Sequence, residues 1–288
     1  MDFMYRPEII VSIVTQKNPD ISVIIPSYNR AHTLQRALDS VLNQTLKPNE
    51  IIVIDDGSTD DTQSVLNLYP GITVIEQSNS GVSSARNSGV EKSSGDWIGF
   101  LDSDDEWLPK KLEKQWAAIC NDDKLISHTE EIWIRNGQRV NPMKKHQKYG
   151  GWIYDKCLPL CVISPSSVMI HKTVFDDVGN FDESLEVCED YDLWLRICSK
   201  YPVLFLDEPL IVKYGGHEDQ LSRKYWGMDR FRITALEKMN NSGYLNKDQH
   251  NATIDMIIQK CEIIINGMKK RGKVYEVQEW EKKLERYN

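Results

Sequence analysis

Acidic side chains are concentrated where apolar stretches of this sequence end. Four of them follow the apolar residues of the segment DWIGFLDSDDEW (96–107): Asp102, Asp104, Asp105 and Glu106. A second pair, Asp55 and Asp56, follows the apolar run IIVI. Carboxylates packed together in a partly dry site are unfavourable unless a cation neutralises them. A divalent metal is the economical cation, and oxygen ligands predict Mn²⁺ or Mg²⁺ rather than zinc, with open positions for substrate phosphates.

A structural interpretation of these acids is also open, because Asp and Glu after a strand often begin a loop or cap the next helix. Glu106 precedes the helical pattern WLPKKLEKQW and is predicted to have that role. For Asp102 and Asp104 the position favours a ligand role. Both follow a predicted buried strand, and a second acidic pair ends another strand.

A second candidate centre is the segment LEVCEDYDLWLRICSK (185–200). Helical spacing places Asp190 three and four residues before the first members of an apolar stripe, on the inward face near a helix start. Asp192 precedes Arg196 by four residues, which predicts a solvated ion pair worth roughly a few tenths of a kcal/mol. The helix dipole alone also favours Glu189 and Asp190 in a first turn.

Strand and helix periods alternate along residues 21–102. Continuous apolar runs predict buried strands, and apolar residues at helical spacing predict helices between them. The expected strands are 21–26, 51–55, 72–76 and 97–102, and the expected helices are 31–44, 58–69 and 80–93. This alternation implies right-handed crossovers and a mostly parallel sheet, so we expect a Rossmann-like α/β half. Ligands of such sheets lie beyond the carboxyl ends of the strands, where the acidic pairs are placed.

Five ordered motifs resemble those of the family 2 glycosyltransferases, which have the GT-A fold. They are VIIPSYNR, IIVIDDGSTDDT, SGVSSARNSG, GDWIGFLDSDD and CEDYDLWLRI, and the resemblance covers about residues 21–217. It implies a transferase that uses a nucleotide sugar and inverts the anomeric centre. By motif, Pro26 and Tyr28 would border the base and Asp56 would form a hydrogen bond to it. Asp102 would face the ribose or the metal, and Asp104 the metal on the diphosphate.

Arg86 would face the nucleotide by the same resemblance, and its fixed fork of donors fits phosphate or carbonyl oxygens. A salt bridge to a neighbouring acid such as Asp55 is the structural alternative. Asp55 could equally brace its loop by accepting hydrogen bonds from backbone N–H groups.

The resemblance further implies that Asp190 is the general base that deprotonates the acceptor hydroxyl, with Glu189 as a supporting residue. A metal that stabilises the leaving diphosphate makes a protein acid unnecessary, so one base is enough. His217 follows a Gly pair and matches the late metal-binding histidine of many GT-A enzymes, although a single His is more often a surface residue. The segment CVISPSSVMI (161–170) is expected to line the donor-sugar or acceptor side.

These observations predict an inverting hexosyl- or N-acetylhexosaminyltransferase. It would move a sugar from a UDP-sugar to a saccharide or lipid-linked saccharide acceptor in surface polysaccharide assembly. A sugar-nucleotide nucleotidyltransferase is the nearest enzyme alternative, but the Gly-rich, Lys-bearing triphosphate loop is missing after the first strand. A catalytically silent nucleotide-sugar binding or scaffold protein is the alternative from another class.

Composition limits the partners and the compartment of this chain of 288 residues. The net charge of −8 argues against nucleic acid as a partner. Six cysteines show no CxxC or pairing pattern, which indicates reduced thiols. No apolar run is long enough to span a membrane and no signal peptide is recognisable. We therefore expect a cytoplasmic protein, at the inner face of the membrane if the acceptor is lipid-linked.

Three parts are expected: an N-terminal extension (1–20), a GT-A catalytic domain (21–217) and a C-terminal helical region (218–288). Helical spacing in the last part predicts helices at 228–239, 246–270 and 274–287. A basic cluster lies at the end of the second of these helices: Lys269, Lys270, Arg271 and Lys273. It could contact an anionic membrane or complement a solvated helix end, and an oligomer surface on these helices is a third alternative.

Overall fold

The computed structural model describes residues 19–216 and 225–287. Strands alternate with helices in its first part: β1 (Ile21–Ser27), α2 (Leu34–Leu42), β2 (Glu50–Asp55), α3 (Thr62–Leu66), β3 (Thr73–Glu76), α4 (Val82–Lys92) and β4 (Trp97–Phe100). Every residue of β1 is buried, as expected for a strand covered on both faces. The predicted order of strands and helices is confirmed.

The remaining elements up to residue 216 include both parallel and antiparallel strands. The symbol η denotes a 3₁₀ helix. These elements are β5 (Glu106–Trp107), α5 (Lys111–Cys120), β6 (Ile126–Arg135), β7 (Gln138–Val140), η1 (Lys144–His146), α6 (Tyr154–Cys157), η2 (Pro165–Ser167), β8 (Met169–His171), α7 (Thr173–Val178), α8 (Glu189–Lys200) and β9 (Leu204–Gly215). The strands of the described residues form one nine-stranded sheet in the order β3-β2-β1-β4-β8-β6-β9-β5, with β7 paired to β6. Strands β3, β2, β1 and β4 are parallel, whereas β8 pairs with β4 and β6 in the antiparallel direction. The predicted α/β class with a Rossmann-like parallel core is confirmed.

Two local predictions differ from the structure. The helix expected at 58–69 is limited to α3, because Asp60 and Asp61 lie in a turn in which Asp60 accepts hydrogen bonds from Ala31 and Thr62. Glu106 does not cap a helix. It lies in β5 and accepts a hydrogen bond from the Tyr214 hydroxyl at 2.7 Å, and α5 begins five residues later.

Helix α4 packs closely against β1 at Gly89. A Cβ atom at this position would lie 2.3 Å from Cγ2 of Ile24, so only glycine allows this approach. Arg86 lies three residues earlier on the same helix and is buried. The close packing therefore fixes the backbone of Arg86 relative to the carboxyl edge of the parallel strands.

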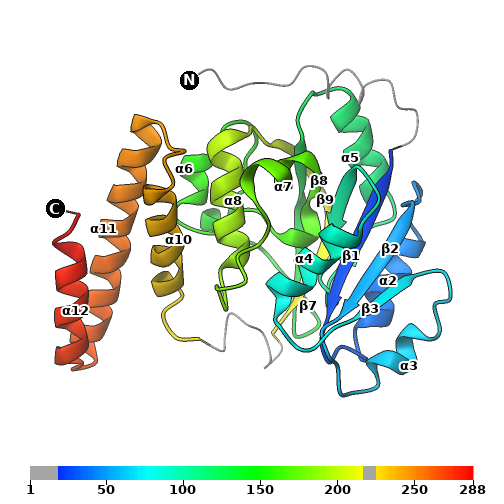
Figure 1. The fold of residues 1–288 in the computed structure, drawn as a ribbon, viewed down its shortest axis with the longest axis horizontal. Helices are drawn as coiled ribbons and strands as arrows, with labels where there is room; N and C mark the ends of the chain where they lie inside the picture. Colours follow the sequence, from blue (N-terminus) through cyan, green and yellow to red (C-terminus); the bar gives the residue numbers. More distant parts are fainter. Residues whose placement is uncertain (1–18, 217–224, 288) are drawn as a thin grey trace.

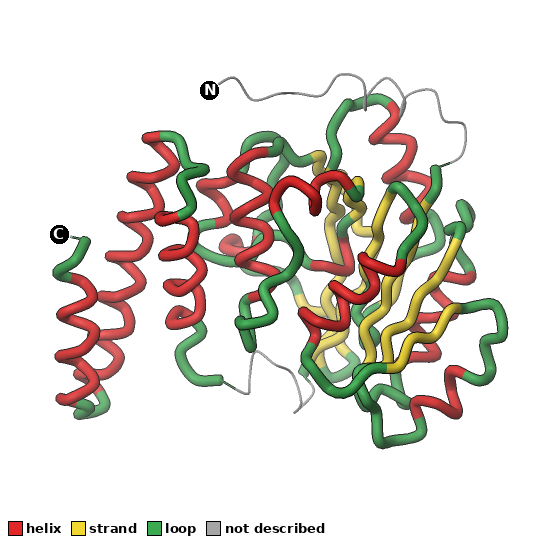
Figure 2. The backbone as a smooth tube through the Cα atoms, in the orientation of Figure 1, coloured by secondary structure: helices red, strands yellow, loops and turns green. Residues whose placement is uncertain are grey.

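The C-terminal part consists of α10 (Asp229–Asn241), α11 (Lys247–Lys270) and α12 (Val274–Leu284). Figure 1 shows these helices at the end of the molecule opposite α3, with α8 between them and the sheet. In Figure 2 the described residues of this end are helical, joined by short loops. One hydrophobic core joins α8 to the C-terminal helices and includes Trp194, Leu236 and Ile257. The predicted C-terminal helical region is confirmed. Among the described residues no helix is both long enough and apolar enough to cross a bilayer.

Candidate active site

A cavity of about 980 Å³ opens at the carboxyl ends of β1, β2 and β4. Side chains from these strand ends, from α4 and α8, and from β9 line it: Pro26, Tyr28, Asp56, Arg86, Asp102, Asp104, Asp105, Glu189, Asp190, Lys213 and Tyr214. Eight of the ten predicted site residues thus surround one cavity. Of the other two, Asp55 is not part of the lining and His217 lies outside the described residues.

The two acids after β2 have different surroundings. Asp55 is buried and its Oδ1 accepts a hydrogen bond from the backbone N–H of Ser58 at 3.1 Å, which braces the loop. Asp56 accepts three hydrogen bonds, from Nε2 of Gln77 (2.7 Å) and from the backbone N–H groups of Ser80 (2.9 Å) and Gly81 (2.8 Å). An ionised carboxylate has about four acceptor positions, so Asp56 keeps one for a donor in the cavity.

Tyr28 is 44% exposed at the end of β1, beside Pro26. Asn29, the next residue, has a left-handed φ of 52°, and its backbone N–H donates to the Ser58 hydroxyl at 2.9 Å. This turn directs the chain away from the sheet and leaves the Tyr28 ring at the cavity. An exposed ring at that position can pack against the flat face of a nucleobase.

Arg86 joins the two acidic centres. Its Nη2 lies 2.8 Å from Oδ1 of Asp102, and its Nη1 lies 2.8 Å from Oε1 of Glu189. Burial disfavours the guanidinium charge, but these two carboxylates outweigh it and raise the pKa of Arg86. The alternative partner that the sequence suggested, Asp55, is wrong. Arg86 instead connects α4, the end of β4 and the start of α8.

The acids after β4 differ in how far neighbouring positive charges offset the effect of burial on their pKa values. Burial favours protonation of Asp102, but Arg86 and Lys213 outweigh it and hold the pKa of Asp102 below its usual range. Burial and the neighbouring Asp102 raise the pKa of Asp104. Burial also raises the pKa of Asp105 to about 8, with Lys213 opposing the rise and the two neighbouring acids adding to it. Arg30 and Lys213 oppose the rise at Asp104 but do not outweigh it.

These residues fit a hard divalent cation that a substrate would complete. Within residues 19–216 and 225–287 no three His, Cys, Asp or Glu side chains form a group that could hold a metal ion. Magnesium-type ions are commonly bound through one or two carboxylates, with waters and substrate phosphates as the other ligands. The carboxylates of Asp104 and Asp102 suit that mode, because both line the cavity and a cation would offset the cost of ionising the buried Asp104.

Sequence reasoning missed Lys213 of the cavity wall, and it did not reveal the contacts of Ser166, a buried residue within the predicted segment 161–170. Lys213 of β9 lines the cavity, and Asp105, Glu131 and Asp102 together outweigh its burial and raise its pKa, so it stays charged. The hydroxyl of Ser166 in η2 donates to Asp105 at 2.6 Å and accepts from the N–H of Asp102 at 3.1 Å. The sequence did contain a signal for Lys213, because it is the one charged residue in the otherwise apolar stretch LIVKY.

Helix α8 brings Glu189 and Asp190 to the cavity. It begins after Cys188, whose φ of 65° is in the left-handed region that a non-glycine residue adopts at a cost of about 1–2 kcal/mol. Glu189 is buried against Arg86, and burial together with Asp190 raises its pKa while Arg86 opposes the rise. Asp190 is half-buried and lines the cavity, so it is the member of the pair that a substrate can reach.

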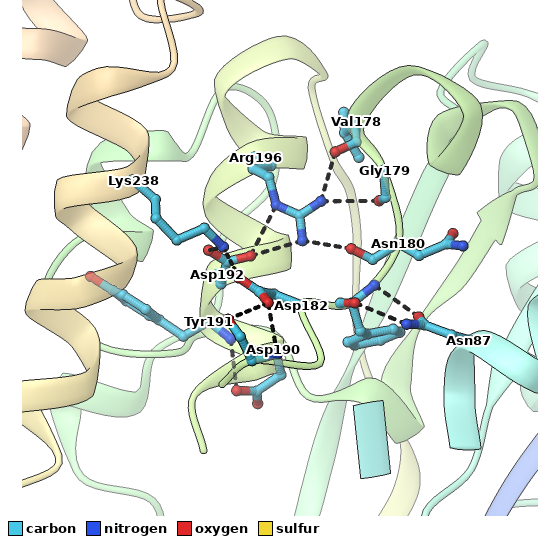
Figure 3. Close-up of polar contacts among 12 residues, drawn as sticks. Asn87, Val178, Gly179, Asn180, Asp182, Asp190, Tyr191, Asp192, Arg196 and Lys238 are labelled. Carbon is cyan, nitrogen blue, oxygen red and sulfur yellow. Dashed lines mark hydrogen bonds and ion pairs between the residues drawn. The ribbon is translucent and has the colours of Figure 1, made fainter. Parts of the chain in front are cut away.

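Asp192 corrects a prediction. Its ion pair with Arg196 is present, at 2.8 Å, but the side chain of Asp192 is completely buried. Lys238 of α10 lies 2.7 Å from its other oxygen, because α10 covers this face of α8. Figure 3 shows Arg196 reaching from Asp192 to the carbonyl groups of Val178, Gly179 and Asn180. The pair is part of a buried network and not a solvated surface contact.

Comparison with known proteins agrees with this geometry. Residues 22–179 match the family model described as glycosyl transferase family 2. An uncharacterised glycosyltransferase of Rickettsia prowazekii is 31% identical over 239 residues, which are 80% of this chain and 73% of that protein. The Escherichia coli enzyme WfgD, a UDP-Glc:alpha-D-GlcNAc-diphosphoundecaprenol beta-1,3-glucosyltransferase, is 33% identical over 180 residues, covering 62% of this chain and 69% of that protein.

The fold has a solved counterpart in TarS of S. aureus, residues 1–349, in complex with UDP-GlcNAc. That structure matches 84% of this chain and 71% of its own, with a TM-score of 0.67 and 19% sequence identity. A likeness at this identity establishes the GT-A fold alone. The family match and the identity to the glycosyltransferase of R. prowazekii go further, and with them this chain belongs to glycosyltransferase family 2.

Proposed function

We propose that this glycosyltransferase transfers a sugar from a UDP-sugar to a hydroxyl group of a saccharide or lipid-linked saccharide, with inversion at the anomeric carbon. The observation that carries the proposal is that carboxylates from two separate elements line one cavity. Asp102 and Asp104 come from the end of β4, and Asp190 comes from the start of α8. The first pair suits a diphosphate with its cation, and Asp190 suits an acceptor hydroxyl.

The nucleotide would lie along the ends of β1 and β2. Tyr28 offers an exposed ring for the base, and Asp56 keeps an acceptor position for a base N–H group. Asp102 would accept from the ribose or approach the metal, since its carboxylate stays ionised beside Arg86. The complexes of TarS with UDP and UDP-GlcNAc support a uridine nucleotide as the first ligand to test.

A direct displacement needs few protein groups. The acceptor oxygen forms a bond to the anomeric carbon as the bond to the diphosphate breaks, and its proton passes to the carboxylate of Asp190. The electron pair of the broken bond leaves with the diphosphate. A cation held by Asp104 and Asp102, when bound, supplies Lewis-acid stabilisation of that leaving group. A single carboxylate suits inversion because no covalent sugar intermediate is needed.

The acceptor and the location belong to the same proposal. The name of the E. coli relative specifies a diphosphoundecaprenol-linked sugar, which supports a lipid-linked acceptor in surface polysaccharide assembly. Such an acceptor would place the enzyme at the inner face of the membrane. In the basic cluster at the C-terminal end of α11, Lys269 and Lys273 form ion pairs with Glu281 and Glu276. These pairs favour a structural role for half of the cluster.

Asp190→Asn tests the proposed base. Turnover of UDP-glucose or UDP-GlcNAc with a diphospholipid-linked GlcNAc acceptor should fall by about 10²–10⁴-fold, because a positioned base contributes that much. The affinity for UDP, measured by calorimetry, should stay within about twofold, since the proposed role of Asp190 is towards the acceptor and not the nucleotide. Glu279→Gln, on the exposed face of α12, is the matched control.

Two outcomes would contradict the proposal. Full turnover by the Asp190→Asn enzyme would remove Asp190 from the chemistry. A wild-type protein that binds UDP tightly but transfers no sugar from either donor would support a nucleotide-sugar binding or scaffold protein instead. The anomeric configuration of the product, read by NMR, decides whether the reaction inverts.

A further inference from the structure

A cysteine thiol contacts the proposed base. Sγ of Cys161 lies 3.2 Å from Oδ2 of Asp190 and 3.1 Å from the carbonyl oxygen of Ile163. The other oxygen of Asp190 accepts a hydrogen bond from the backbone N–H of Tyr191 at 2.7 Å. Each carboxylate oxygen of Asp190 therefore has one donor from the protein, and the donor to Oδ2 is a side chain.

The thiol is in its donor form. Burial and the nearby Asp190 carboxylate raise the pKa of Cys161 well above its usual value, so the sulfur keeps its proton at neutral pH. One S–H group cannot serve both acceptors at once, and a charged acceptor forms the stronger hydrogen bond. The thiol proton therefore favours Asp190 while the carboxylate is ionised, and it can turn to the carbonyl of Ile163 when Asp190 is protonated.

The segment that carries Cys161 is held at three carbonyl groups. The hydroxyl of Tyr191 donates to Leu158 O at 2.6 Å, and Nζ of Lys260 on α11 donates to Pro159 O at 2.8 Å. Nζ of Lys148 donates to Val162 O at 3.0 Å. Both lysines are buried, and each also pairs with a carboxylate, Asp229 for Lys260 and Glu131 for Lys148.

These anchors limit the movement of Cys161 relative to α8. Leu158 is fixed by the residue next to Asp190, so the segment and the helix start are joined directly. Lys260 adds a connection to the C-terminal helices, which lie beyond the 22–179 region of the family match. A thiol in such a fixed position can orient a carboxylate in a way that a mobile side chain or a water molecule cannot.

We infer that Cys161 is a positioning residue for the reaction, which orients the Asp190 carboxylate before each transfer. This inference rests on the proposed role of Asp190 as the base. Among the residues that the structure describes, the other charged or titratable groups close to Asp190 or Cys161 include Glu189, Cys188, Lys213 of β9 and Arg232 of α10. They are unchanged in the variants below, so any difference in pH dependence comes from the thiol.

The test compares Cys161→Ala and Cys161→Ser with the wild type. A hydrogen bond donated to a carboxylate stabilises its ionised form, and a hydroxyl is a stronger donor than a thiol. The acidic limb of the kcat profile should therefore move up by about 0.4–0.7 pH unit in the Ala variant and down in the Ser variant. At neutral pH the Ala variant should lose about two- to fivefold in kcat with the donor KM unchanged, and Ser should restore it.

Cys120→Ala on α5 is the matched control, because it removes a thiol that is not at the cavity. Thermal unfolding of each variant separates a folding defect from a change in the chemistry. Profiles of the Ala and Ser variants that coincide with the wild type, or that shift in the same direction, would overturn the inference. If the Asp190→Asn enzyme kept the acidic limb, the proposed function itself would fail, whatever the cysteine variants do.

Discussion

Lys111 is a completely buried lysine at the start of α5. Its Nζ donates to Oε1 of Gln115 at 2.6 Å and lies 4.0 Å from the centre of the Trp107 ring. Burial lowers the pKa of this amine well below its usual value. The unfolded chain then binds a proton that the folded protein releases. The free energy of unfolding must therefore rise with pH towards the ordinary pKa, by up to about 1.4 kcal/mol per pH unit.

Lys111→Met removes the titrating amine and keeps a long side chain. We expect the stability of the wild type relative to this variant, measured by urea denaturation, to increase between about pH 7 and pH 10. Lys110→Met, at an exposed position, should show no such trend. A constant difference over this range would mean that the Lys111 amine titrates as it does in water.

Some residues of the candidate site could be proposed from the sequence because their position at the end of a predicted strand was enough to place them. Asp56, Asp102 and Asp104 each follow an apolar strand, and parallel strand ends meet at one edge of a sheet. Their partners could not be proposed in this way. Arg86 pairs with Glu189, 103 residues away, and no local pattern encodes a contact between α4 and α8.

At the scale of elements, α8 is fixed by a buried ion network on the side away from the cavity. The Asp192 carboxylate accepts from Nε and Nη2 of Arg196, at 3.0 and 2.8 Å, and from Nζ of Lys238 at 2.7 Å. Arg196 also holds the carbonyl groups of residues 178–180, and Asn87 of α4 holds the next residue, Phe181. Figure 3 shows this chain of contacts running from α10 through α8 towards α4.

Two substitutions separate the members of this network. Arg196→Met leaves a buried carboxylate with one remaining cation and frees three carbonyl groups, so it should cost about 3–5 kcal/mol of stability. Lys238→Met should cost about 1 kcal/mol or less, because the lysine is 40% exposed and Asp192 keeps Arg196. Urea denaturation of the two variants checks the order. Equal losses would mean that Asp192 does not depend mainly on Arg196.

Elements with a regular period were predictable, and elements defined by distant pairing were not. The strands β1 to β4 are recognisable in the sequence as apolar runs of the expected length. The two-residue β5 exists only because it pairs with β9, more than one hundred residues later. Asp192 and Arg196 were paired correctly by their helical spacing, but their burial depends on α10, which the spacing within α8 does not reveal.

At the scale of the whole molecule, the C-terminal helices and the sheet share their packing. Residues of α10 and α11 belong to the same core as α8 and the β4 residue Phe100. Sequence periodicity predicted these helices, but it did not predict where they pack, because an apolar stripe shows which face of a helix is buried and not which element covers it. The consequence for function is that the start of α8 is supported both from the sheet, through Arg86, and from the C-terminal side, through Lys238.

The molecule as a whole brings acids from several strand ends and from α8 around one cavity, and the account depends on a cation joining a diphosphate to Asp104. Calorimetric titration of UDP with Mn²⁺ and with EDTA, on the wild type and on Asp104→Asn, tests this most directly. Glu186→Gln, at another carboxylate of the cavity wall, is the control. We predict that Mn²⁺ tightens UDP binding at least about tenfold in the wild type and the control but not in Asp104→Asn. The same gain with Mn²⁺ in the Asp104→Asn protein, or no gain in the wild type, would contradict the account.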